Sequence, residues 1–140
     1  MFEAKRVING TYGTVRLEGQ LLAESFKLQA KVEVTREEVQ MCGALVPGQK
    51  LTKLNYSGTL GLHKANSTLA KMIANDIKAG IDHSYTIISK LEDPDAYGKE
   101  CVALSGCKFS DLTLADWEAA VLGKIEAPFT FSDYEFIDMI

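Results

Sequence analysis

DLTLADWEAAVLGKIEAPFTFSDYEFIDMI, residues 111–140, is the most informative stretch of this chain of 140 residues. Over residues 117–131 the odd positions are apolar or small, whereas most even positions are polar. Alternation with a period of two predicts a strand with one buried face, here about 15 residues long. The chain then ends on Phe136, Ile137 and Ile140, and an apolar terminus is expected to dock on another surface.

A second alternating stretch, residues 26–34, is stricter than the first. Its apolar face holds Phe26, Leu28, Ala30, Val32 and Val34, and Lys27, Gln29, Lys31 and Glu33 lie on the other face. If Leu22 is included, the predicted strand has about 14 residues, which is more than a small barrel requires. A strand that extends past its own domain usually pairs with a neighbour or covers one.

The rest of the chain predicts further strands and one helix. Alternation or apolar runs predict strands over residues 12–18, 53–63, 85–91 and 101–109. Pro128, which lacks an N–H, marks an edge or a bulge in the last strand. The total is six or seven strands joined mostly by short turns, which favours antiparallel pairing.

The helix is predicted over residues 66–80, after the third strand. Apolar residues recur there at helical spacing, Asn66 or Ser67 can cap the N-terminus, and Gly80 stands where a C-terminal glycine is expected. The fold class is therefore mainly β with one α-helix: an antiparallel β-sandwich or barrel with a flanking helix. At this length we expect a single domain, residues 1–140.

Residues 36–52, REEVQMCGALVPGQKLT, show no clear periodicity and predict an unusually long loop. The loop carries Val39, Met41, Leu45 and Val46, and a solvated loop would not normally contain so many apolar groups. Two interpretations remain open: the loop folds back over the end of the barrel, or it meets another subunit.

Motifs for catalysis, cofactors or metals are not found in the sequence. His63 and His83 lack partners at metal-ligand spacing, and Asp93 and Asp95 are better explained as turn residues before and after Pro94. The three cysteines do not form a disulfide framework, and we expect buried, free thiols. We therefore predict no enzymatic activity, no cofactor and no metal site.

The net charge of −4 argues against a nucleic-acid-binding surface, but the charge is unevenly distributed. Residues 1–91 hold 12 Lys and Arg against 8 Asp and Glu, whereas residues 92–140 hold 3 against 11. The halves could interleave in space, or give a subunit oppositely charged rims suited to head-to-tail stacking. No secretory signal, membrane anchor or long apolar run is seen, so we expect the protein in the cytoplasm.

Five stretches, taken in this order, resemble the tail tube proteins of contractile tails. They are NGTYGTVRLEG, FKLQAKVEVTREEV, SGTLGLHKANS, ISKLEDPDAYG, and DLTLADWE followed by EAPFTFSDYEFIDMI. Tail tube proteins build the inner tube of myovirus-type phages, defective prophages and R-type bacteriocins. The resemblance implies a two-sheet β-barrel fold with a helix on its side, and hexameric rings stacked into a hollow tube inside a contractile sheath.

The resemblance also implies partners and contacts. Residues 1–10 would form an N-terminal arm and residues 36–52 an extended inter-subunit loop. The expected oligomer contacts are Val39, Met41, Leu45, Val46, Phe136, Ile137 and Ile140. Partners would be further copies of the chain, the sheath protein, and the tube initiator or baseplate and terminator proteins. DNA would be only passing cargo, and only in a phage.

Assembly would take place in the cytoplasm of the host bacterium, and the product would be a virion tail or a released tail-like particle. Two alternatives remain open: a type VI secretion-like tube protein and a monomeric, small-ligand-binding β-barrel. Size-exclusion chromatography would separate the monomeric barrel from a tube-forming protein.

Overall fold

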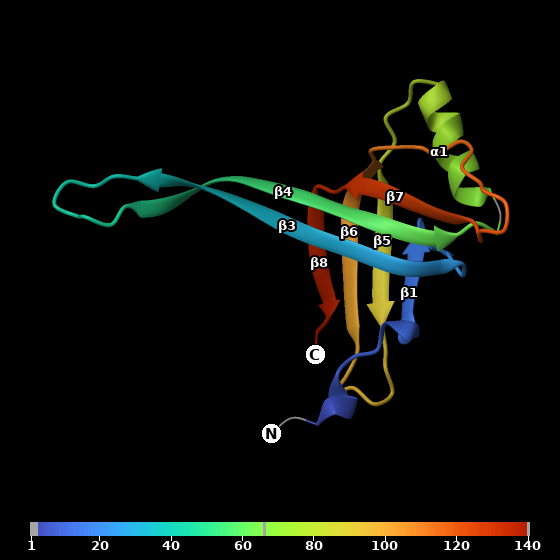
Figure 1. The fold of residues 1–140 in the computed structure, drawn as a ribbon, viewed down its shortest axis with the longest axis horizontal. Helices are drawn as coiled ribbons and strands as arrows, with labels where there is room; N and C mark the ends of the chain where they lie inside the picture. Colours follow the sequence, from blue (N-terminus) through green and yellow to red (C-terminus); the bar gives the residue numbers. More distant parts are fainter. Residues whose placement is uncertain (1–2, 66, 140) are drawn as a thin grey trace.

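The computed structural model describes residues 3–65 and 67–139 (Figure 1). Two short 3-10 helices, η1 (Ala4–Arg6) and η2 (Gly10–Tyr12), precede the first strand. The remaining elements, in chain order, are β1 (Gly13–Leu17), β2 (Gln20–Leu21), β3 (Ser25–Val39), β4 (Gly48–His63), α1 (Thr68–Lys78), β5 (Tyr85–Leu91), β6 (Glu100–Phe109), β7 (Lys124–Thr130) and β8 (Asp133–Asp138).

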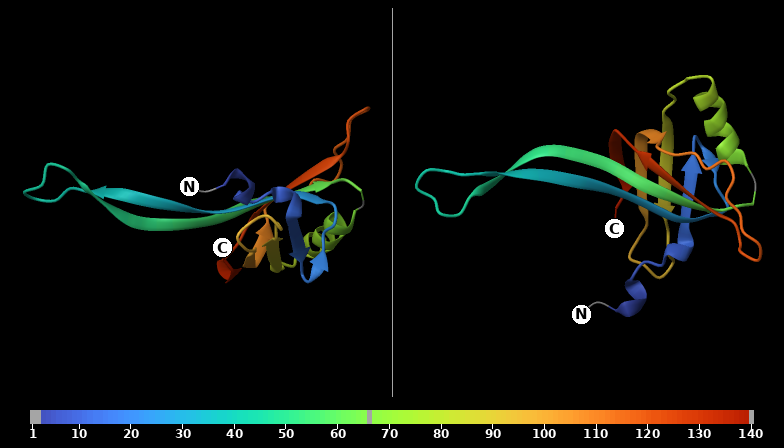
Figure 2. Two further views of the ribbon diagram at one scale, coloured as in Figure 1. Left: turned by 90° about the horizontal axis from the view of Figure 1, so that it is seen from below. Right: turned by 45° about the horizontal axis from the view of Figure 1, so that its top comes forward.

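All strand pairs are antiparallel, as predicted. The strand order is β2-β1-β5-β6-β7-β4-β3, and β8 pairs with β6. The strands form two layers, with β3, β4 and β7 crossing over β1, β5, β6 and β8 (Figures 1 and 2). Among the described residues the sheet does not close into a barrel, so the sandwich is the right form of the predicted fold class.

The core lies where the two layers cross. Leu17, Ile87 and Leu104 from one layer and Leu60 and Phe129 from the other are almost completely buried. These apolar side chains leave water together, and that removal of apolar surface is the main favourable term for folding.

The helix α1 flanks one end of the sandwich. Leu69 and Ile73 are buried, whereas Ile77 is exposed, so only part of the expected apolar stripe enters the core. The Tyr85 hydroxyl donates a hydrogen bond to a carboxylate oxygen of Asp76 at 2.6 Å and ties the helix to β5. Burial, and then this hydrogen bond, raise the pKa of Tyr85 to about 12.

The helix boundaries predicted as 66–80 are close to those observed. Asn66 lies outside the described residues, and the side chain of Ser67 makes no capping hydrogen bond. Gly80 has a φ of +73°, and its N–H donates to the carbonyl of Ile77. The prediction of a C-terminal glycine is thus confirmed, because this left-handed conformation is strained for other residues.

The strand predicted over residues 117–131 is wrong in its first half. β7 begins only at Lys124, which pairs with His63, the last residue of β4. Residues 117–123 have no strand beside them, and alternation alone cannot hold a strand without a ladder partner. From residue 125 onward the predicted alternation is confirmed, with Phe129 and Phe131 buried and Thr130 exposed.

The loop predicted over residues 36–52 is shorter than expected. β3 continues to Val39 and β4 begins at Gly48, so only residues 40–47 connect the two strands. Thr35 pairs with Lys53 but Arg36 pairs with Leu51, which leaves Thr52 as an extra residue. This β-bulge shifts the alternation by one position and hides the strand from a periodicity search.

A turn at Leu22 separates two strands that were predicted as one. The backbone N–H and the hydroxyl of Ser25 both donate to the carbonyl of Leu22. Leu22 is buried under the turn, which explains its apolar character without a continuous strand.

Two of the glycines within strands mark close contacts. A Cβ on Gly58 would lie 2.6 Å from the ring of Phe129 and would also clash with the carbonyl of Gln29. Gly106 has a φ of +65° and faces Ser132 closely.

Pro128 lies in β7, and its carbonyl accepts a hydrogen bond from the Ser110 N–H, one residue after the end of β6. This bond lies on the side of β7 that faces away from β4. The absent N–H of Pro128 therefore interrupts no strand ladder.

Candidate assembly surfaces

The β3–β4 hairpin extends far beyond the sandwich. β7 pairs with β4 only over residues 57–63, so residues 33–55 form a two-stranded ribbon that we call the arm (Figure 1). An isolated two-stranded ribbon is only marginally stable in water. The arm is therefore the part of the fold with the greatest need for additional packing.

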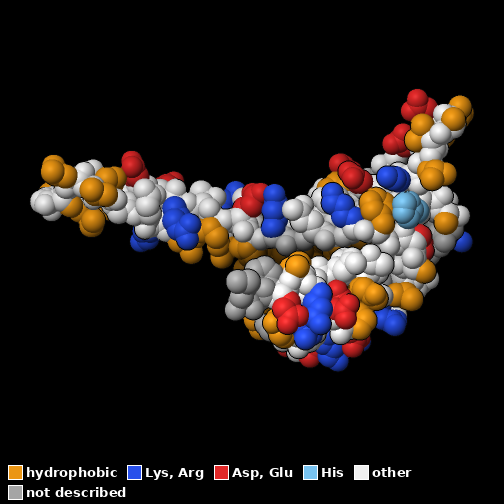
Figure 3. All heavy atoms as spheres, turned by 60° about the horizontal axis from the view of Figure 1, so that its bottom comes forward, with side chains coloured by type: hydrophobic (Ala, Val, Ile, Leu, Met, Phe, Trp, Pro, Cys, Tyr) orange, Lys and Arg blue, Asp and Glu red, His pale blue; other side chains and the backbone are white. Residues whose placement is uncertain are grey.

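The arm ends in residues 39–47, which we call the arm tip. The tip contains no charged residue. Leu45 is 100% exposed and Val46 78% exposed, and Val39 and Met41 are also exposed. Figure 3 shows hydrophobic side chains gathered at this end of the molecule. The interpretation that these residues fold back over the sandwich is therefore wrong.

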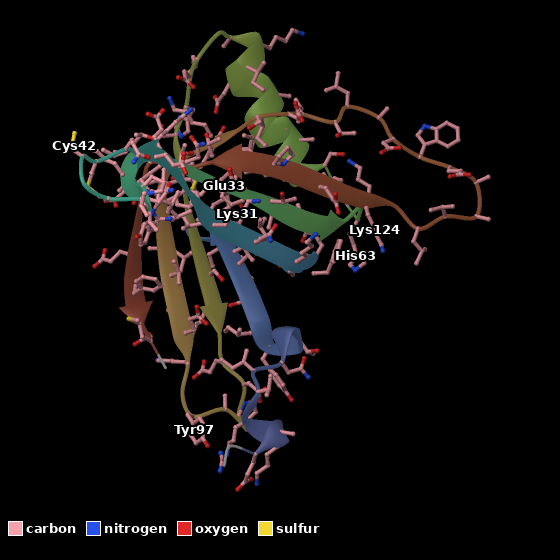
Figure 4. The ribbon with its side chains drawn as sticks, turned by 60° about the vertical axis from the view of Figure 1, so that its left-hand side comes forward. Lys31, Glu33, Cys42, His63, Tyr97 and Lys124 are labelled. Carbon is pink, nitrogen blue, oxygen red and sulfur yellow. The ribbon has the colours of Figure 1, made fainter. Side chains whose placement is uncertain are left out.

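Charged side chains follow the arm's polar face. Figure 4 shows Lys31 and Glu33 near its base and Cys42 at the tip. The Lys31 Nζ lies 3.0 Å from the Glu33 Oε1, an exposed pair that contributes little to stability.

Cys42 is exposed, which corrects the expectation of three buried thiols; Cys101 and Cys107 are buried. Burial raises the pKa of the Cys107 thiol to about 11.

The C-terminal strand β8 forms a second candidate surface. It pairs with β6 on one side only, so its other edge is unpaired among the described residues. Phe136 and Ile137 are about half exposed, and Ile140 lies outside the described residues. The backbone of the apolar terminus is thus docked, as expected, while its side chains remain accessible.

An apolar groove of about 410 Å³ lies beside β8, between the two layers. Its lining comes from β3, β5, β6 and the C-terminal region, and includes Leu28, Val32, Val102, Phe131 and Phe136. The groove connects the open side of the sandwich with the apolar face at the base of the arm.

Residues 111–123 form a third surface, which we call the acidic segment. It holds Asp111, Asp116 and Glu118 but no Lys or Arg. Trp117 is 87% exposed and Leu122 84% exposed, and the segment projects from the end opposite the arm (Figure 2). Sequence reasoning missed this surface because it placed Trp117 inside a strand. A lone tryptophan among three carboxylates was the available signal.

The N-terminal residues 4–9 lie against the β5–β6 loop. The buried carboxylate of Asp93 accepts hydrogen bonds from the backbone N–H groups of Asn9 and Asp95, each at 2.9 Å. The guanidinium of Arg6 donates to the Asp95 carbonyl and lies 5.1 Å from the ring centre of Tyr97, which is labelled in Figure 4. The turn role predicted for Asp93 is confirmed.

The described residues offer no arrangement suited to metal chemistry. No group of three or more His, Cys, Asp or Glu in that part of the chain could hold a metal ion. His63 is exposed and packs against Phe26, with 4.6 Å between ring centres, and His83 packs against Tyr85 in the same way. Across the described ranges, no helix is long and apolar enough to cross a membrane.

The open two-layer sandwich with one flanking helix and a long arm is a fold shared with chains of contractile injection systems. A chain of the extracellular contractile injection system PVC sheath–tube complex superposes with a TM-score of 0.75 at 11% identity, covering 97% of this chain and 95% of that one. A chain of the anti-feeding prophage tube-terminating cap gives 0.73 at 10% identity, covering 97% and 94%. At these identities the likeness shows the fold alone.

Residues 1–138 match the family model described as phage tail tube protein, and the chain belongs to this family. It is 30% identical over 136 residues to the phage-like element PBSX protein XkdM of Bacillus subtilis strain 168, covering 95% of this chain and 92% of the relative. The protein is thus a structural component of a phage tail or phage-tail-like particle, and no enzymatic family is indicated.

Proposed function

We propose that this protein forms hexameric rings that stack into the inner tube of a contractile phage tail or tail-like bacteriocin. The observation that carries the proposal is the arm, residues 33–55, whose apolar residues no described part of the chain covers. Monomeric proteins rarely expose apolar surface on this scale, and burial against further copies removes it from water.

The proposed contacts are the arm and the C-terminal strand. Val39, Met41, Leu45 and Val46 would meet neighbouring copies at one end of the subunit, and Phe136, Ile137 and Ile140 would do so beside β8. Residues 1–10 would form a further contact, and residues 1–140 a single tail tube domain. The free edge of β8 supports this assignment, because an unpaired edge is a template for association.

The tube would act mechanically, as a rigid conduit driven through a bacterial envelope when the sheath shortens. Its partners would be the sheath, the tube initiator or baseplate and the terminator. The fold shared with chains of a sheath–tube complex and of a tube-terminating cap supports this set of partners. DNA would pass only as cargo, and assembly would take place in the host cytoplasm.

Light scattering and negative-stain microscopy of the purified protein over a range of concentrations test the proposal. We expect mass to increase with concentration, and class averages of rings with sixfold symmetry, some of them stacked. A particle that remains monomeric at the highest concentration, with no rings by microscopy, would contradict the proposal. Such a result would favour the alternative of a monomeric, ligand-binding β-barrel. The observed sheet supports that alternative less well, because over the described residues it does not close into a barrel.

A further inference from the structure

The arm tip and the acidic segment carry the most exposed large apolar side chains of the described residues. Leu45 and Val46 stand at the tip, and Trp117 and Leu122 stand on the segment. The two surfaces lie at opposite ends of the longest axis of the molecule (Figure 1), so they cannot meet within one chain. Each therefore requires a partner outside its own subunit.

The two surfaces are chemically complementary. The arm tip is uncharged, and the residues at its two sides, 36–38 and 48–53, hold Arg36, Lys50 and Lys53 against Glu37 and Glu38. The acidic segment itself has three carboxylates and no basic residue, and two lysines, Lys64 and Lys124, adjoin it. An apolar centre free of charge, with opposite charges at its rim, is the usual composition of a specific interface.

The acidic segment also offers a shaped receptor. A depression of about 530 Å³ lies beneath it, lined by Trp117, Leu122, Ile125, Lys64 and Lys124 among others. An exposed tryptophan beside such a depression has the character of an interface anchor, because tryptophan dominates binding energies when a partner covers it.

We propose that the arm tip of one copy binds the acidic segment of the next copy, a head-to-tail contact that gives the proposed tube function its directional link. The partner is thus a second copy of this chain. Because the two contacting patches differ, every added copy presents a new free tip or a new free segment, so the contact repeats until the rotation closes or a filament grows. Contact between two tips would instead stop at a pair and leave the acidic segment uncovered.

Two double variants test the contact. Leu45→Ser with Val46→Ser removes the most exposed apolar side chains of the tip. Trp117→Ser with Leu122→Ser does the same in the acidic segment. A matched control, Gln29→Ser with Asn75→Ser, changes two exposed polar positions elsewhere. Circular dichroism checks the folding of each, and sedimentation velocity at equal concentrations measures their mass.

We expect the control to assemble like the wild-type chain and each double variant to associate at least about tenfold more weakly. An equimolar mixture of the two variants should associate more strongly than either variant alone, because the mixture retains one intact tip and one intact segment. A mixture that stays as unassociated as its components, or a segment variant that assembles normally, would overturn the proposal.

A charge exchange covers the case in which the segment variant does not fold. Lys50→Glu with Lys53→Glu, and Asp116→Lys with Glu118→Lys, change only exposed positions. Each pair should weaken association alone, and mixing the two variants should restore it; no restoration counts against the contact. Absence of any wild-type assembly would instead count against the proposed tube function, so the two failures are distinguishable.

Discussion

The same two strands behave differently at their two ends. Near the sandwich, Leu60 and Leu62 of β4 are almost completely buried, whereas Val34 and Leu54, farther along the arm, are 42% and 46% exposed. Both ends present an apolar face with the same period, but the second layer of strands underlies only the first. Alternation therefore shows which face is apolar, and the neighbouring layer decides whether that face is buried. Under the proposed function, another copy of the chain would supply the layer that the arm lacks.

The strongest test of this contrast is a deletion in the core of the sandwich. Phe129→Ala should lower the free energy of unfolding by about 3–5 kcal/mol, because the ring is 1% exposed and its loss leaves a cavity. Thr130→Ala is the control on the opposite, exposed face and should cost much less. Urea unfolding followed by circular dichroism measures both values, and equal losses would contradict the assigned faces of β7.

An addition at the same place should have a smaller effect. Gly58→Ala should cost about 1–3 kcal/mol, because the new methyl group would collide with the Phe129 ring and the Gln29 carbonyl. The control is Gly10→Ala, at which a Cβ would meet no atom within 4 Å. If urea unfolding gives the two variants the same stability, the close packing of β4 on β7 is not as described.

Two buried titratable groups of the sandwich, Tyr85 and Cys107, should make the stability of the subunit depend on pH. The pKa of Tyr85 is raised from 10.0 to about 12 in the folded state, so its contribution to stability is present below pH 10 and is lost as the pH rises through 12. Cys107, raised from 9.0 to about 11, adds a loss that begins at lower pH.

Urea unfolding at a series of alkaline pH values should therefore show stability falling as pH increases. Tyr85→Phe should flatten the decrease above pH 10, and Tyr97→Phe, at an exposed position, is the matched control. An unchanged slope in Tyr85→Phe would show that folding does not raise the pKa of Tyr85.

The smallest change in subunit stability per substituted site is expected in the arm tip. Replacement of Val39, Met41, Leu45 and Val46 by Ser together should change the free energy of unfolding by less than about 0.5 kcal/mol per site, as for exposed positions generally. Assembly should nevertheless be lost, as microscopy would show. A variant that unfolds would place these residues in the subunit's own core and remove the distinction between arm and sandwich.

Much of the fold was predictable because local patterns and tertiary packing agree. β5 occurs at the predicted residues 85–91, and the alternation of Phe129, Thr130 and Phe131 is confirmed where β7 has a partner. The failures have one cause in common: strand pairing decides where a strand forms, and periodicity along the sequence does not show which segments pair. Residues 117–123 alternate without a partner strand. Residues 36–39 pair with residues 48–51, but a bulge at Thr52 disguises their period.

The candidate surfaces were predicted unevenly for a related reason. The apolar residues of the arm tip were noticed because they lie in a stretch without a strand pattern. The exposure of Trp117 and Leu122 was not predicted, because both residues fell within the strand expected over residues 117–131. An exposed apolar residue and a buried one look alike in a sequence, and only the three-dimensional arrangement distinguishes them.

The positions of Trp117 and Cys42 have an optical consequence. Trp117 is the single tryptophan of the chain, and Cys42 is the only exposed cysteine of its three. Indole fluorescence would consequently report on the surroundings of the acidic segment and change little when the core unfolds. A thiol-reactive dye on Cys42 would mark the far end of the same molecule. The native sequence thus carries a donor position and an acceptor position at its two extremities, ready for energy-transfer measurements without any mutation.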